Sequence, residues 1–108
     1  MNCFRYMWIG ESISEKRKEV MQQLKRNRLP KTVYALVLPE NDSSLLNIIT
    51  GNYLKQEYYK KSGMTVVGAA GSKEEAMELS AQILDMIYKR NGNFDLKAYI
   101  REAEEAAT

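Results

Sequence analysis

Residues 66–76 read VVGAAGSKEEA, and they combine the end of an apolar strand, a glycine turn and the start of a helix. Ser72 and Glu75 have the S-x-x-E spacing of a capping box, which satisfies the free amides of a first helical turn. Residues 64–70, which lead into the turn, form an apolar run typical of a strand covered on both faces. A strand that passes through such a turn into a helix is the repeating unit of α/β folds.

The same unit is predicted twice more toward the N-terminus. Residues 3–9 alternate aromatic and other bulky side chains and predict a strand. Ser12 and Glu15 then predict a capped helix that runs to about residue 28. Residues 32–38, TVYALVL, predict a second buried strand, and the apolar spacing over 44–61 predicts the helix that follows it.

Two further helices are predicted in the C-terminal third. Residues 73–90 carry a broad apolar face, and its breadth indicates burial against a sheet. That face contains Ala76, Leu79, Ile83 and Ile87, with Met77, Leu84 and Tyr88 beside them. Asn91 and Gly92 predict the end of this helix, and Asp95 predicts the start of the last one.

Strands that alternate with helices imply a parallel sheet with right-handed crossovers. The 108 residues have the length of one domain. We therefore expect a single α/β domain over residues 1–108. The expected fold is a small three-layer βαβαβα(α) arrangement, in which helices flank a three-stranded, mostly parallel sheet. A two-layer α+β fold is the alternative, and the sequence leaves the strand order and the direction of the first strand open.

The composition excludes several chemistries. The chain has no histidine and one cysteine, so it cannot hold a Ser-His-Asp or Cys-His arrangement, a histidine-ligated metal or an internal disulfide. Glu40 and Asp42, with Glu11, could hold magnesium, but two acids in a helix-start turn are more often capping residues. We expect no catalytic residue, no metal site and no cofactor, and we interpret Cys3 as a small buried residue of the first strand.

The N-terminal stretch MNCFRYMWIG lacks the apolar core of a signal peptide, and no window is apolar enough for a membrane span. We therefore expect a cytoplasmic protein with no membrane association.

A ligand site, if present, would lie at the turns after the three strands, since ligands of open α/β sheets bind at the carboxyl ends of strands. The candidates for a small anionic or phosphorylated ligand are Glu11, Ser12, Glu40, Asp42, Ser43, Gly71 and Ser72. Glu74 and Glu75 weigh against a phosphate, because they already occupy the positive end of a helix. The glycine spacing also matches neither common phosphate-binding loop.

A second ligand class is nucleic acid. Residues 1–31 carry eight basic and three acidic side chains, and the predicted first helix holds Lys16, Arg17, Lys18, Lys25 and Arg26. Such a helix can be an electrostatic footprint for nucleic acid. The overall net charge is only +2, so we favour a solvated helix face and do not expect nucleic acid as a partner.

The leading hypothesis is a domain without intrinsic catalysis that self-associates or binds another protein. A short sheet exposes two edges, which association can cover, and we expect a homodimer. Tyrosines suit half-buried contact surfaces, and the predicted helices are rich in them. They are Tyr53, Tyr58, Tyr59, Tyr88 and Tyr99.

Overall fold

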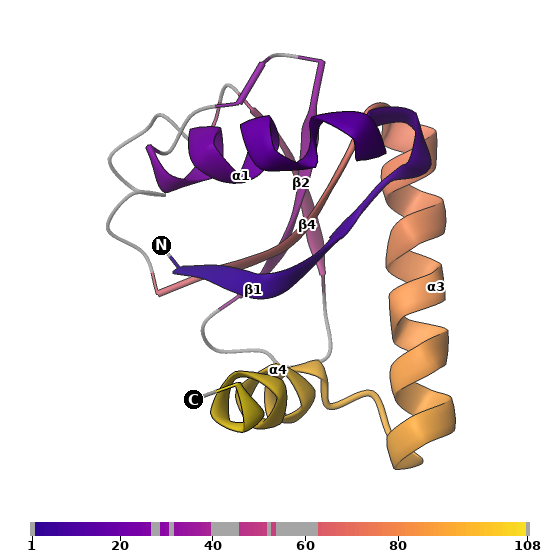
Figure 1. Ribbon diagram of the computed structural model, residues 1–108. Coiled ribbons are helices and arrows are strands. Elements are labelled where there is room, and N and C mark those ends of the chain that lie inside the picture. The colour runs from indigo at the N-terminus through magenta and orange to yellow at the C-terminus, as the bar shows by residue number, and fades with distance from the viewer. Residues whose placement is uncertain are drawn as a thin grey trace.

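The computed structural model describes residues 2–26, 29–30, 32–39, 46–51, 53 and 63–107 of a mixed α/β domain. Figure 1 shows the elements along the chain. They are β1 (Asn2–Ile9), the 3-10 helix η1 (Glu11–Lys16), α1 (Arg17–Lys25), β2 (Tyr34–Leu38), β3 (Asn47–Thr50), β4 (Thr65–Ala70), α3 (Lys73–Asn91) and α4 (Leu96–Ala106).

The sheet has four strands in the order β1-β4-β2-β3. β1 and β4 are parallel, whereas β2 runs antiparallel to both β4 and β3. The prediction of a three-stranded, mostly parallel sheet is therefore wrong in both respects. The physical reason is an additional strand, β3, which pairs antiparallel with β2, while β2 itself pairs antiparallel with β4.

β3 lies inside the segment predicted as a helix over 44–61. Its four residues, NIIT, pair with β2 from Tyr34↔Thr50 to Val37↔Asn47 and bury Ile49. An apolar run this short fits helical and extended periods equally well, so only the available partner strand decides between them. Residues 44–45, 52 and 54–61 of that prediction lie outside the described residues.

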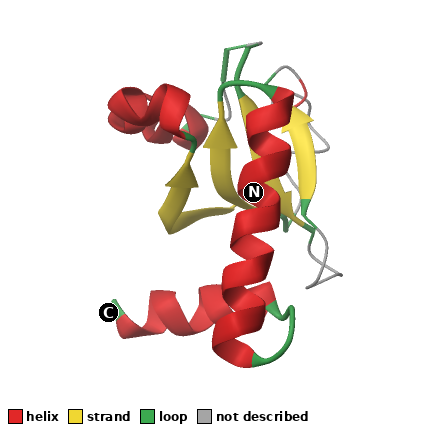
Figure 2. Ribbon diagram, turned by 90° about the vertical axis from the view of Figure 1, so that its right-hand side faces the viewer, coloured by secondary structure: helices red, strands yellow, loops and turns green. Residues whose placement is uncertain are grey.

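Helices lie on both sides of the sheet. α3 packs against β2, β3 and β4 and crosses in front of the strands in Figure 2. α1 and α4 flank β1 from above and below in Figure 1. The core between these layers includes Phe4, Leu24, Leu36, Ile83, Ile87 and Leu96. No helix among the described residues is long and apolar enough to span a membrane.

Three of the predicted helix signals are confirmed. Ser72 Oγ accepts a hydrogen bond from Glu75 N at 3.1 Å, and Asp95 caps α4 in the same way through Ala98 N. Gly92 ends α3 with a left-handed φ of 75°. The prediction for Ser12 is wrong: Gly10 is the N-terminal cap of η1, and the Ser12 side chain bonds to α3 instead.

The outer edge of β1 is covered by side chains from two helices. Arg5 and Met7 lie in the irregular part of β1, where its pairing with β4 is interrupted between Cys3 and Trp8. Arg5 N donates to Glu104 of α4 at 2.8 Å, and Met7 O accepts from the Arg17 guanidinium at 2.9 Å. Occupied backbone groups of this kind protect an edge strand from pairing with another chain.

Candidate functional site

The carboxyl ends of β1 and β4 lie at the same end of the sheet, because these two strands are parallel. Glu75 joins the turns that follow them. Its carboxylate accepts a hydrogen bond from Gly71 N at 2.7 Å, and from Ser12 N and Oγ at 3.1 and 2.7 Å. The carboxylate thus satisfies amides from both turns at the positive end of α3.

The glycines of the two turns approach the contact between Glu75 and Ser12 closely. A Cβ at Gly71 would collide with Ser12 Oγ, and one at Gly10 would collide with the Glu75 carboxylate. The hydrogen bond from Gly71 N, followed by that from the Ser12 hydroxyl, lowers the pKa of Glu75 below its usual range. The chain's own carboxylate therefore occupies the position that a phosphate would take at a helix N-terminus.

The structure brings together part of the predicted ligand set. Ser12, Gly71 and Ser72 lie around Glu75, and Glu11 lines an adjoining groove of about 280 Å³ with Glu75 and Glu78. Three carboxylates make this groove unsuited to an anion.

The third predicted turn does not join the other two through its strand. β2 is antiparallel to β4, so Leu38 pairs with Thr65, where β4 begins. The carboxyl end of β2 therefore lies at the opposite end of the sheet from those of β1 and β4. Glu40, Asp42 and Ser43 lie outside the described residues.

The five basic residues proposed for nucleic acid are exposed, but they are divided between two flanks of α1. Arg17 bonds to the β1 edge, and Lys25 lines a groove beside Cys3. Lys16 and Arg26 line cavities on the other flank, each together with Glu19. Lys18 lies among solvent-exposed neighbours. This dispersal provides no continuous basic track along the helix.

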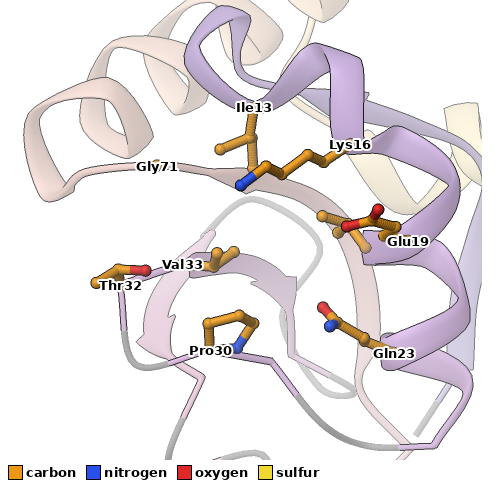
Figure 3. Close-up of a pocket in the computed structure, with 9 residues that line it drawn as sticks. Ile13, Lys16, Glu19, Gln23, Pro30, Thr32, Val33 and Gly71 are labelled. Carbon is orange, nitrogen blue, oxygen red and sulfur yellow. The ribbon is translucent and has the colours of Figure 1, made fainter.

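A small cavity of about 150 Å³ lies between α1 and the segment that leads into β2 (Figure 3). Its apolar wall includes Ile13, Val20 and Val33, and its polar lining includes Lys16, Glu19, Gln23 and Thr32. Figure 3 shows the Lys16 ammonium group extending across the cavity toward Gly71, with Glu19 and Gln23 on the adjoining side. The cavity therefore presents one positive and one negative group to the same space.

Cys3 is exposed, so its interpretation as a buried residue is wrong. It lines a groove of about 300 Å³ with Met7, Met21 and Lys25. Partial burial of the sulfur raises the pKa of the Cys3 thiol, which outweighs the opposing effect of the nearby N-terminus and Lys25. A raised pKa leaves little thiolate at neutral pH, so the surroundings of Cys3 do not favour a role as a nucleophile.

The outer face of α3 carries two exposed large apolar side chains. Met77 and Tyr88 are 56% and 51% exposed, and Leu84 between them is half-buried without packing on the core. Phe94, in the turn after α3, stacks on Tyr88 with ring centroids 4.9 Å apart and remains 48% exposed. The predicted burial of the whole apolar breadth of α3 thus holds for Ile83 and Ile87 but fails for Met77 and Tyr88.

The described residues contain no group of three or more acidic or cysteine side chains that could hold a metal ion. Every buried side-chain nitrogen or oxygen among them has a hydrogen-bond partner. No known family model, curated protein or solved structure matches this chain.

Proposed function

We propose that this domain acts by contact and self-associates through the outer face of α3. The observation that carries the proposal is the stacked, half-exposed pair Tyr88 and Phe94, which continues an apolar stripe along the helix. We call this row the α3 stripe and define it as Met77, Ala81, Leu84 and Tyr88. A contiguous exposed apolar patch on a globular domain is typical of an interaction site.

A second copy of the chain is the partner that the α3 stripe fits best. Its spacings of four, three and four residues are those of helices that pair side by side, and they read the same in both directions. In an antiparallel pair, Met77 would meet the partner's Tyr88, and small Ala81 would meet the partner's Leu84. Methionine–aromatic contacts are favourable, and a twofold axis requires a self-complementary surface.

Charge supports the antiparallel direction at the helix ends. The first turn of α3 carries Glu74 and its last turn carries Lys89, so the two would approach each other across the pair. Glu78 and Asp85 flank the middle of the stripe and would oppose association, although Lys89 already pairs with Asp85 at 2.9 Å within the chain. The balance predicts a weak dimer that forms more readily at higher salt.

The exposed area leads to the same estimate of strength. Aromatic side chains bury about 150–250 Å² each, so half-exposed Tyr88 and Phe94 offer roughly 100 Å² apiece. With Met77 the sum is about 300 Å² per copy, whereas a standard interface needs about 800 Å² per partner. The polar flanks must contribute the remainder, and we expect a dissociation constant in roughly the micromolar to millimolar range.

Sedimentation velocity over a concentration series tests the proposal. We expect the wild-type sedimentation coefficient to rise with concentration, and the double variant Tyr88→Ser with Phe94→Ser to remain a monomer. Tyr6→Ser is the matched control, because Tyr6 is also 50% exposed but lies on β1. A wild-type protein that stays monomeric throughout, or a double variant that associates as the wild type does, would contradict the proposal.

A further inference from the structure

We propose that the cavity beside α1 binds a small zwitterion of the amino-acid class. The cavity of about 150 Å³ lies between η1 and α1 on one side and Pro30, Thr32 and Val33 on the other (Figure 3). It is on a different element from the α3 stripe, so this inference does not depend on self-association.

The charges that line the cavity determine the ligand class. Lys16 and Glu19 both face it, and neither has an ion-pair or hydrogen-bond partner for its side chain within the described part of the chain. An anion would be attracted by Lys16 but repelled by Glu19. A cation would be attracted by Glu19 but repelled by Lys16. A ligand that carries both charges satisfies both groups, with its carboxylate at Lys16 and its ammonium group at Glu19.

The neighbouring grooves among the described residues have different linings. In the groove beside Cys3, Arg5 and Glu104 already pair with each other at 3.7 Å. In the groove beside Glu11, the charged groups are all carboxylates. Glu19 and Arg26 also line a groove of about 160 Å³ on this flank, but no apolar side chain lines that groove. Among these described sites, the cavity beside α1 combines two opposite charges available to a ligand with an apolar wall.

The remaining lining limits the size of the ligand. Gln23 is half-buried, and its side-chain amide has no hydrogen-bond partner among the described residues. This side chain can therefore donate to a carboxylate or accept from an ammonium group. Ile13, Val20 and Val33 provide an apolar wall for a short aliphatic side chain. Since a water molecule occupies about 30 Å³ of liquid, the cavity has room for about five waters. Glycine, alanine and serine are of this size.

Titration of the labelled full chain with L-alanine, followed by amide NMR shifts, tests the proposal. We expect saturable shifts around residues 13–23 and 32–33, with a dissociation constant of about 1 mM, as befits so small a ligand. Acetate and methylamine, which each carry one of the two charges, should bind about tenfold more weakly, because each lacks one charge-assisted hydrogen bond.

Two variants locate the binding. Lys16→Gln and Glu19→Gln should each weaken alanine binding about tenfold. Lys18→Gln is the matched control, because it removes an exposed charge of the same helix that does not line the cavity, and it should leave the affinity unchanged. The proposal is overturned if alanine causes no saturable shift, if acetate alone binds as tightly, or if both cavity variants bind like the wild type.

Discussion

Replacing Glu75 with alanine would remove the carboxylate that joins the turn after β1 to the start of α3. The variant loses three hydrogen bonds, two from Ser12 and one from Gly71 N. The Ser72 cap remains, because it is made to the backbone amide of residue 75. The change therefore isolates the side-chain contribution of Glu75 to the junction of these two elements.

The three lost hydrogen bonds set the expected loss in the free energy of unfolding. A hydrogen bond to a charged group contributes about 1.5–3 kcal/mol when it is shielded from water. The Ser12 side of the junction is exposed, so solvent screening reduces each bond to well under that range. We expect the free energy of unfolding to fall by about 2 kcal/mol, and the melting temperature by about 10 °C for a domain of this size.

The loss should depend on pH in one direction. The hydrogen bonds hold the pKa of Glu75 below its value in the unfolded chain, which is about 4.3. Stability from a lowered pKa is fully present above the unfolded value and disappears as the pH falls through the folded value. The difference between wild type and variant should therefore be constant from about pH 8 to pH 5 and should shrink below about pH 4.

Urea unfolding followed by the fluorescence of Trp8, the one tryptophan, measures this difference across the pH series. Glu74→Ala is the control, because Glu74 is also in the first turn of α3 but is exposed and makes no side-chain hydrogen bond. The reasoning is refuted if Glu74→Ala costs as much as Glu75→Ala, or if the Glu75 deficit persists undiminished at pH 3.

Three further predictions follow from the strand contacts. Gly68→Ala should lower the unfolding free energy by about 2–3 kcal/mol, because the new Cβ would lie 2.6 Å from the Trp8 carbonyl oxygen; thermal unfolding near the wild-type temperature would contradict this. Arg17→Ala combined with Glu104→Ala should uncover the β1 edge and cause the chains to associate, as measured by light scattering. Each single change should cause less association than the double change. Cys3 should react with iodoacetamide more slowly than free cysteine at pH 7.5, because its thiol pKa is raised. An equal or faster rate would contradict the raised pKa.

Local signals predicted most of the described helices and strands, but not their arrangement in the sheet. The β1, β2 and β4 segments and the α3 and α4 helices lie where periodicity and capping residues predict them, within a few residues at their ends. β3 was missed because the sequence around Ile48 and Ile49 has apolar spacing that a helix also satisfies. The close approach at Gly68 is made by the Trp8 backbone and Leu36 of two neighbouring strands, and local periodicity does not reveal such a contact.

The candidate surfaces were less predictable. The breadth of the apolar face of α3 was visible in the sequence, but breadth alone does not distinguish the side that meets the sheet from a second side that faces solvent. Phe94, just beyond a predicted helix end, was the available signal for the exposed side. Glu75 was expected near the positive end of α3, but its bonds to Ser12 depend on a contact between residues 63 positions apart.

Short-range physics therefore determined most of the described elements, though not β3: apolar periods, the Ser72 and Asp95 caps and the left-handed Gly92 all act within a few residues. The absence of histidine likewise limits the chemistry of the chain whatever its fold. Tertiary structure alone decided the direction of β2, because backbone hydrogen bonds can form with either sense of a neighbouring strand. That direction placed the end of β2 away from the other two turns, and packing on the sheet then left the α3 stripe facing outward.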